Sequence, residues 1–166
     1  LMGLSFSGTR PRDLDTALLQ QVQAAAGGET LSDMSDMSVW LYSYLHALDN
    51  GDMQAAQGWS ARMASSIDAY VDGFKQGIAT ELALFAVLHQ RDVEEARRWL
   101  ARSKGGVVDA SRRDLAFAAV AMLEQDHVQA KRSLDDAQRH LHQGMDAGIA
   151  HLTAEQITTL RDKLTH

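Results

Sequence analysis

The sequence predicts an all-helical domain of stacked antiparallel helical hairpins, with about seven to eight helices. Three observations lead to this prediction. Only one of the 166 residues is proline, Pro11, so the strongest helix breaker is nearly absent. Residues that favour strands are few beside Ala, Leu, Gln and Arg, and aromatic residues make up only 6% of the chain. A short turn motif recurs three times, and no sheet is expected.

The recurring motif is a turn followed by Asp and, four residues later, by Ala. Its three copies cover residues 50–56, 90–96 and 124–130. Asp52, Asp92 and Asp126 suit the N-cap of a helix, because their carboxylates can accept a hydrogen bond from a free backbone N–H. The Ala that follows is small enough to let two helices approach closely. Each copy therefore predicts the bend of a helical hairpin.

The predicted elements follow from these bends and from the hydrophobic pattern around them. The helix before each bend is apolar nearly all round and should be packed on several sides, whereas the helix after it is amphipathic and should form the outer layer. Residues 1–10 are expected to be a linker or the end of an upstream segment, and residues 11–166 a single domain. Within that domain we expect an N-terminal helix at 11–28, hairpin one at 32–72, hairpin two at 74–104, hairpin three at 109–144 and a C-terminal capping helix at 153–165.

Two details of this layout can be tested against a structure. The bends at Gly51, Arg91 and Gln125 are 40 and then 34 residues apart, so the first interval carries about six extra residues. These are expected at residues 67–77, in an extended outer helix that ends near Gly73. The string Thr153-Ala154-Glu155-Gln156 has the form of a capping box and should open the C-terminal helix.

Over roughly residues 37–143 this pattern resembles the tetratricopeptide repeat family, whose period is about 34 residues. The positions that fit the family are Trp40, Gly51, Asp52 and Ala56 in the first repeat, Asp92 and Ala96 in the second, and Ala118, Asp126 and Ala130 in the third. The small first-helix position instead holds Tyr44 and Leu84 in the first two repeats, and the closing proline is missing throughout. The resemblance implies a right-handed superhelical stack that binds a protein or peptide.

A second, shorter resemblance concerns residues 6–15 and 44–52. They look like the segment that follows the last membrane helices in bacterial site-2-protease-like membrane metallopeptidases. This resemblance implies a soluble accessory domain of a membrane-embedded zinc metallopeptidase, tethered to the inner face of the membrane through an upstream segment. No catalytic residue carries over, because the chain contains no HExxH. Any peptidase chemistry would lie outside these residues.

The candidate binding site is the inner curve of the predicted stack, here called the inner face. Its residues are Leu41, Leu45, Leu48, Phe85, Leu88, His89, Arg112, Leu115 and Met122. This surface is mostly apolar and lacks the Lys and Arg clamp of a site for an acidic peptide terminus. It should bind an apolar or amphipathic segment, which includes a second copy of the chain in a homodimer. Alternatively, one of the chain's own terminal helices fills it, since large exposed apolar patches are unusual.

Composition excludes several classes of function. The net charge of −6 disfavours nucleic-acid binding, which needs a clustered basic face. The absence of cysteine excludes disulfides, thiolate catalysis and Cys-ligated zinc, and it fits the cytoplasm. No stretch approaches the roughly 20 apolar residues that cross a bilayer, so no membrane insertion is expected.

The residues of ordinary active sites do not form a recognisable set. Ser65, Ser66 and Ser111 lack a Gly-x-Ser-x-Gly elbow. His140 and His142 are two residues apart and would lie on different sides of a helix, so they predict no shared metal ion. We therefore expect no catalytic residue, no metal and no cofactor, and the sequence predicts a non-catalytic protein-interaction domain.

Overall fold

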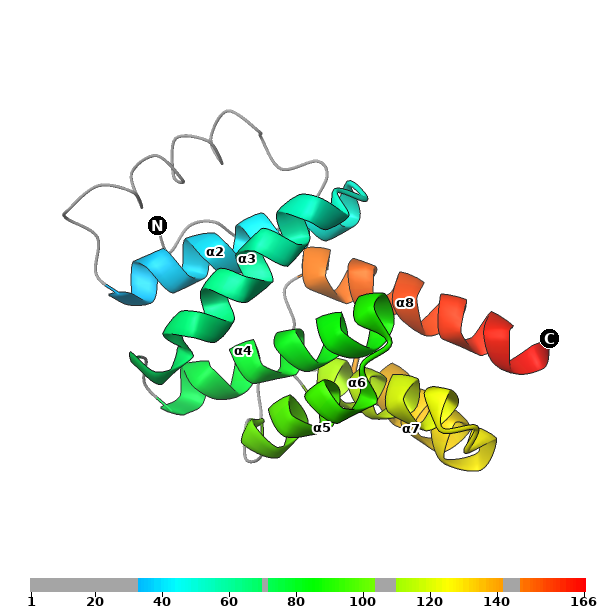
Figure 1. Ribbon diagram of the computed structural model, residues 1–166. Coiled ribbons are helices and arrows are strands. Elements are labelled where there is room, and N and C mark those ends of the chain that lie inside the picture. Colours follow the sequence, from blue (N-terminus) through cyan, green and yellow to red (C-terminus); the bar gives the residue numbers. More distant parts are fainter. Residues whose placement is uncertain (1–32, 70–71, 104–109, 142–146) are drawn as a thin grey trace. The chain divides into compact units, whose positions relative to one another are not determined.

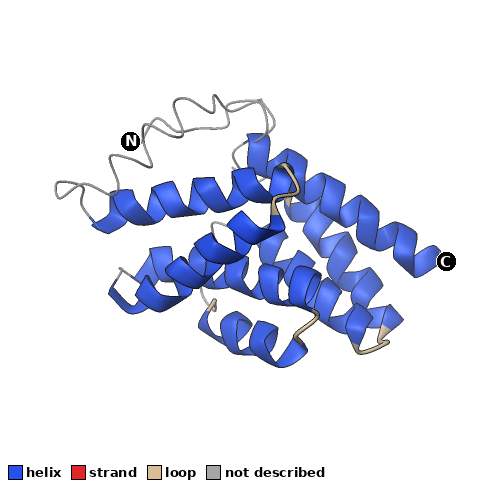
Figure 2. Ribbon diagram, turned by 45° about the horizontal axis from the view of Figure 1, so that its top comes forward, coloured by secondary structure: helices blue, strands red, loops and turns tan. Residues whose placement is uncertain are grey.

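A computed structural model describes residues 33–69, 72–103, 110–141 and 147–166. Within these ranges the chain forms seven α-helices and no strand, so the predicted all-helical class is confirmed (Figures 1 and 2). The predicted N-terminal helix at 11–28 lies outside the described residues. Where the sequence predicts one domain, the structure divides the chain into two compact units. The first is Leu1–Val71 with Asp146–Ile149, and the second is Asp72–Met145 with Ala150–His166.

The first unit contains one helical hairpin. Helix α2 (Asp33–Asp49) packs along α3 (Met53–Ser66), and a 3₁₀ turn at Ile67–Ala69 follows. Large side chains from both helices, including Tyr44, Leu45 and Met63, are buried. The Arg62 guanidinium of α3 lies 4.6 Å from the centre of the Trp40 ring of α2, so a cation–π contact joins the two helices.

The second unit contains two hairpins and most of a final helix. Its helices are α4 (Asp72–Phe85), α5 (Val93–Arg102), α6 (Ala110–Leu123), α7 (His127–His140) and α8 (Ala147–Thr165), of which residues 150 onward belong to this unit. Helix α4 pairs with α5, α6 pairs with α7, and α4 also packs against α6. The predicted alternation of a buried helix and an amphipathic helix is therefore present in both hairpins.

The three bends have the local structure that the motif predicts. Asp52, Asp92 and Asp126 each accept a hydrogen bond from the backbone N–H three residues later, at 2.9–3.0 Å, and so cap the next helix. The residue before each Asp is left-handed: φ is +72° at Gly51, +56° at Arg91 and +63° at Gln125. The small residues that follow, Ala56, Ala96 and Ala130, are fully buried. The Asp N-caps are confirmed, and the burial of the three Ala residues fits their predicted place between two helices.

The second bend differs from the other two by one residue. The N–H groups of Asp52 and Asp126 each donate to the carbonyl five residues earlier, on Ala47 and Ala121. The N–H of Asp92 instead donates to the carbonyl of Ala86, six residues earlier, because the chain forms a π-helical turn at Ala86–Gln90.

The extra residues between the first two bends lie only partly where the sequence predicts them. The outer helix α3 is longer than α5, with 14 residues against 10, but it does not reach Gly73. Helix α3 ends at Ser66, and Gly73 lies inside α4 rather than at the end of an outer helix. Helix α4 and the π-helical turn after it have 14 and 5 residues, whereas α6 before the third bend has 14. The longer interval thus lengthens both the outer helix and the buried helix that comes after it. Gly73 does not end a helix, since a single glycine is tolerated inside one.

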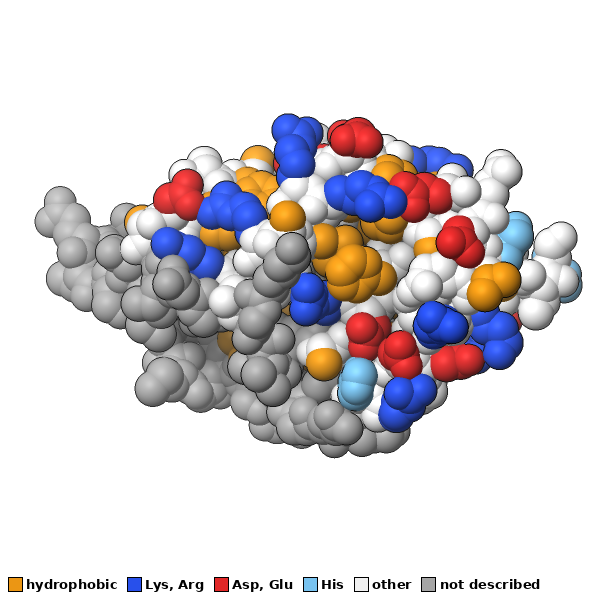
Figure 3. Space-filling view, turned by 90° about the horizontal axis from the view of Figure 1, so that it is seen from below, with side chains coloured by type: hydrophobic (Ala, Val, Ile, Leu, Met, Phe, Trp, Pro, Cys, Tyr) orange, Lys and Arg blue, Asp and Glu red, His pale blue; other side chains and the backbone are white. Residues whose placement is uncertain are grey.

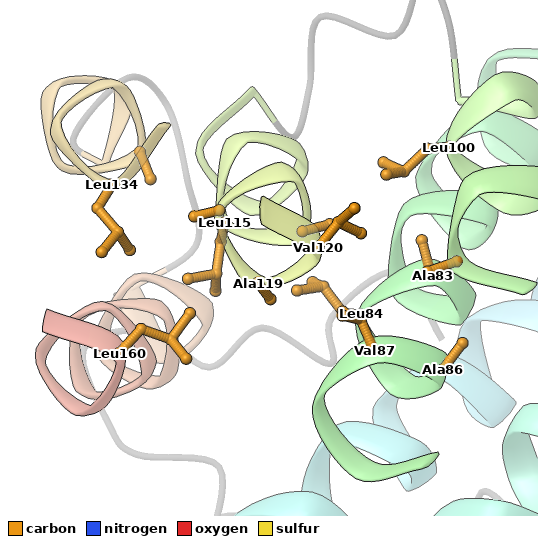
Figure 4. Close-up of a cluster of buried hydrophobic side chains, with 14 of the residues drawn as sticks. Ala83, Leu84, Ala86, Val87, Leu100, Leu115, Ala119, Val120, Leu134 and Leu160 are labelled. Atoms are coloured by element: carbon orange, nitrogen blue, oxygen red, sulfur yellow. The ribbon is translucent and has the colours of Figure 1, made fainter. Parts of the chain in front are cut away.

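The core of the second unit joins all five of its helices. One buried cluster contains Leu84 of α4, Val87 of the π-helical turn, Leu100 of α5, Leu115 and Ala119 of α6, Leu134 of α7 and Leu160 of α8 (Figure 4). Figure 4 shows Leu115, Leu134 and Leu160 pointing toward one another from three helices. Helix α8 is therefore part of this core.

Helix α8 begins earlier than the capping box predicts. It starts at Ala147, and Thr153 lies inside it, fully buried. The prediction that Thr153 opens the helix is wrong, because its hydroxyl accepts a hydrogen bond from Arg112 of α6 instead of a free N–H of its own helix. Among the helices in the described ranges, none combines the length and apolarity needed to cross a membrane.

Candidate functional site

The predicted inner-face residues belong to both units, so each set is described by itself. In the first unit, Leu45 is buried, while Leu41 and Leu48 are half-buried. In the second unit, Phe85, Arg112 and Leu115 are buried, Leu88 and Met122 are half-buried, and His89 is exposed. Of the nine predicted inner-face residues, four are thus buried in the core, four are half-buried, and only His89 is exposed to solvent.

Part of the inner face is covered by the chain's own C-terminal helix. Leu115 and Ala119 of α6 share a buried cluster with Ile157 and Leu160 of α8, and Leu164 packs against it. Of the two occupants that the sequence leaves open, a partner segment or a terminal helix, the terminal helix takes this part of the surface. Helix α6 therefore does not present Leu115 to a ligand in this arrangement.

A buried polar cluster fixes α8 to α4 and α6. Arg112 is only 1% exposed. Its Nε donates to Oε1 of Glu81, and its Nη2 donates to Oε2 of the same carboxylate at 2.7 Å. Its Nη1 donates to Oγ1 of Thr153 at 2.9 Å and to Oε1 of Gln156 at 3.1 Å. Since all three guanidinium nitrogens are used, this cluster has a structural role, and Arg112 is not free to bind a ligand.

Two further inner-face residues touch each other where α4 passes into the π-helical turn. The rings of Phe85 and His89 have their centres 5.3 Å apart and are inclined by 43°. Desolvation by the surrounding protein lowers the pKa of His89, although the side chain keeps solvent contact. The contact between the imidazole and the aromatic ring gives His89 a packing role beside Phe85.

A second surface lies on the other side of α6, between α5 and the start of α7. We call it the outer groove. Its residues are Arg97, Leu100, Ala101, Arg113, Phe117, Val120, Ala121, Glu124, Asp126 and Gln129, and its volume is about 470 Å³. Figure 3 shows the structure from below the view of Figure 1, with a patch of hydrophobic side chains bordered by basic and acidic ones. All ten lining residues belong to the second unit.

Phe117 and Arg113 are the distinctive pair of the outer groove. Phe117 is 39% exposed, which makes it one of the few large hydrophobic side chains on the described surface. The Arg113 guanidinium lies 5.4 Å from the centre of the Phe117 ring. The Nε of Arg113 is shielded from solvent and, among the described residues, has no hydrogen-bond partner. An exposed aromatic ring thus lies beside a cation whose hydrogen-bonding capacity is not used.

The other charged groups of the outer groove have partners. Arg97 donates to one carboxylate oxygen of Glu124 from Nε at 3.2 Å and from Nη2 at 2.5 Å. This hydrogen bond and the charge of Glu124 raise the pKa of Arg97. Asp126 uses one carboxylate oxygen to cap α7. Arg113 differs from these groups, because no hydrogen bond or ion pair engages its guanidinium within the described residues.

The outer groove is not among the surfaces that the sequence predicts, because the family resemblance implies a ligand on the inner face. The available signal was the spacing of Arg113 and Phe117, which are four residues apart on a helix and so lie on one stripe. In an otherwise small and aliphatic helix, a bulky ring and a cation on the same stripe suggest a surface rather than core.

A histidine and an aspartate form a further polar pair between α6 and α7. Nδ1 of His140 lies 2.7 Å from Oδ2 of Asp114. Burial raises the pKa of Asp114, and the hydrogen bond with His140 opposes this shift. One turn earlier, the Ser111 hydroxyl donates to the Ala137 carbonyl at 2.6 Å. These contacts hold the two helices together, and they give Ser111 a packing role.

Comparison of the chain with protein-family models, with curated proteins and with solved structures gave no match. Within the described ranges, no group of three or more His, Cys, Asp or Glu side chains is placed to hold a metal ion. The outer groove offers an apolar surface and one guanidinium with unused capacity, which is suited to non-covalent binding.

Proposed function

We propose that the chain is a non-catalytic protein-interaction domain and that the outer groove is its binding surface. The observation that carries this proposal is the exposed Phe117 ring beside the Arg113 guanidinium, whose Nε lacks a partner among the described residues. Aromatic residues and arginine are the residue types that dominate binding energy in protein interfaces. The bound species is a segment of another protein that covers Phe117.

The helical framework supports this role. The bends at Arg91 and Gln125 share the left-handed residue and the Asp N-cap, and the two hairpins of the second unit share a core. Stacked hairpins of this kind present grooves between neighbouring helices, as tetratricopeptide-type proteins do. Because α8 covers part of the inner face, we place the ligand in the groove between α5, α6 and α7 instead.

The test uses Phe117→Asp with Val128→Asp as its matched control. Val128 of α7 is 79% exposed and does not line the outer groove, so the control adds the same charge to an exposed apolar position elsewhere. A random dodecapeptide display library is selected on the full 166-residue chain, and the enriched peptides are titrated against wild type and both variants by calorimetry. Circular dichroism and thermal melts establish that both variants are folded.

We expect the enriched peptides to bind Phe117→Asp at least about tenfold more weakly than wild type, because the ring is replaced by a solvated carboxylate. Their affinity for Val128→Asp should be unchanged. Peptides that bind Phe117→Asp as tightly as wild type would place the binding surface elsewhere.

A further inference from the structure

The inference concerns the chemistry of the segment that binds the outer groove, and it rests on the proposed function. We infer that this segment carries a side-chain carboxylate close to an apolar side chain. The carboxylate pairs with the Arg113 guanidinium, and the apolar side chain packs on Phe117. The partner is therefore an acidic, amphipathic peptide segment rather than a purely apolar one.

The first step is the state of Arg113 without a ligand. Its Nε is withdrawn from solvent and has no hydrogen-bond partner in the described part of the chain. No other atom of its guanidinium has a hydrogen bond within the described part of the chain, and the residue is half-buried. A partly desolvated guanidinium without an acceptor is unfavourable, so a ligand acceptor at its Nη groups gains more than the same acceptor would gain at a hydrated arginine. Guanidinium groups match carboxylates in shape and charge, which makes a carboxylate the preferred acceptor.

The second step is the balance of charge around the groove. Glu124 is engaged by Arg97, and Asp126 caps α7. Asp114, which follows Arg113 in the sequence, is engaged by His140. These nearby carboxylates already have donors, so each is bound within the protein. A ligand carboxylate would therefore find Arg113 with unused donors, while a ligand cation would find no carboxylate of the groove without a hydrogen bond.

The third step is the number of charges that the groove accepts. Two basic and two acidic side chains line it, Arg97 with Arg113 and Glu124 with Asp126. A single carboxylate matches the one charge of Arg113, whereas a dianionic phosphate brings an excess negative charge next to Glu124 and Asp126. A phosphorylated segment is therefore the less favoured ligand. The experiment distinguishes the two, because a phosphoserine replacement of the acidic residue is compared directly.

The fourth step is the distance between the two contacts. Arg113 and Phe117 are one helical turn apart, and the guanidinium lies 5.4 Å from the ring centre. When a carboxylate of the ligand pairs with Arg113, the neighbouring residues of the ligand therefore lie next to the Phe117 ring. In the ligand, the acidic and apolar residues should be within about four positions of each other, the spacing that puts two side chains on one face of a helix.

The experiment starts from the peptides enriched by the dodecapeptide selection. Each is synthesised with its acidic residue intact, replaced by the matching amide, and replaced by phosphoserine. The three forms are titrated against wild type, Arg113→Gln and Arg113→Lys, with circular dichroism as a check on folding. Arg113→Lys keeps the positive charge but removes the Nε–H and the bidentate geometry.

For wild type we expect the amide peptide to bind about tenfold more weakly than the acidic one, and phosphoserine to bind no better than the acid. With Arg113→Gln, the acidic and amide peptides should bind equally, and Arg113→Lys should recover only part of the difference. Three results would each overturn the inference. The enriched peptides could lack an acidic residue, their preference for the acid over the amide could persist in Arg113→Gln, or the phosphoserine form could bind more tightly than the acid. Failure of the proposed function would look different, since the peptides would then be insensitive to Phe117→Asp.

A second readout does not depend on the library. Phenylacetate and its neutral isostere phenylacetamide are titrated into the ¹⁵N-labelled chain at constant ionic strength, and the Nε–H resonance of Arg113 is followed by NMR. Phenylacetate should shift this resonance in wild type but not in Phe117→Asp. Phenylacetamide should shift it less than phenylacetate does in wild type. Equal shifts from both compounds, or none from phenylacetate, would contradict a carboxylate at Arg113.

Discussion

Arg112 and Arg113 are consecutive residues of α6 with opposite situations. Arg112 is buried and uses all three guanidinium nitrogens on Glu81, Thr153 and Gln156. Arg113 is half-buried, lies over Phe117 and keeps an Nε without a partner among the described residues. One residue turns the side chain by about 100° around the helix axis. The guanidinium group therefore stabilises helix packing on one side of α6, at Arg112, and remains available to bind a ligand on the other side, at Arg113.

The largest expected difference comes from the same substitution at both positions. Arg112→Met leaves the Glu81 carboxylate buried without its cation, which should lower the free energy of unfolding by about 3–5 kcal/mol. Arg113→Met removes one cation–π contact near the surface and should cost about 0.5–1 kcal/mol. Urea denaturation of both variants measures the difference, and equal losses would contradict the assignment of separate roles.

A smaller effect isolates the contact between Arg112 and α8. Thr153→Val removes the buried oxygen that accepts from Nη1 of Arg112, and should lower stability by about 1–3 kcal/mol. Thr158→Val is the matched control on the exposed side of the same helix, where the hydroxyl donates only to the Ala154 carbonyl. The control should change stability by less than about 0.5 kcal/mol. A Thr153→Val variant as stable as wild type would show that the buried polar cluster around Arg112 does not stabilise the packing of α8.

The next substitution tests whether Asp126, a charged residue of the outer groove, has the structural role that distinguishes it from Arg113. Asp126 lines the groove and caps α7, so Asp126→Ala should cost about 1 kcal/mol. Asp126→Asn retains an acceptor oxygen at the cap and should be nearly neutral. Thermal melts compare the two, and equal destabilisation would mean that the negative charge rather than the cap is what matters.

The smallest effect concerns Asp114, the next residue along α6. Burial raises its pKa from the ordinary value of 3.8, and the hydrogen bond with His140 acts in the opposite direction. A carboxyl group with a raised pKa favours the folded state most when protonated, so this contribution is present at low pH and lost as pH rises through the folded-state pKa. His140→Leu removes the opposing hydrogen bond, and the pKa of Asp114 should rise further.

Carboxyl ¹³C NMR measures that pKa directly in both proteins. Urea midpoints at about pH 3 and about pH 7 should show His140→Leu losing more stability, relative to wild type, at the higher pH, where the carboxylate is ionised without its partner. A lower or unchanged pKa of Asp114 in the variant would contradict a hydrogen bond that favours the charged form.

The bends were predictable because their causes are local. An Asp N-cap and the Ala that follows it act within one helical turn, and Asp52, Asp92 and Asp126 behave as the motif predicts. The start of α8 was not predictable in this way. Thr153 has the local form of a cap, but its hydroxyl is bound by Arg112, which lies 41 residues away in the chain. Long-range partners of this kind leave no trace in a short sequence window.

The candidate site shows the same limit. Glu81 and Arg112 are recognisable in the sequence as charges on mostly apolar helices, but only the packing of α4 against α6 shows that they pair with each other. The sequence pattern predicts that Leu115 contacts a ligand, whereas α8 covers it. The stripe of Arg113 and Phe117 on α6 indicates an exposed surface, but the outer groove also needs α5 and α7, so the pattern of one helix does not indicate the groove.

The π-helical turn at Ala86–Gln90 has a consequence for how the length of such a chain can change. The turn lets the second bend hold one more residue than the other two, yet the left-handed Arg91 and the N-cap at Asp92 are retained. The extra residue is taken up at the end of a helix, before the bend, and the following helix begins as it does elsewhere. An insertion or deletion of one residue in this turn can therefore be absorbed without shifting α5 in register, which makes the end of a buried helix a tolerant position for changes in length.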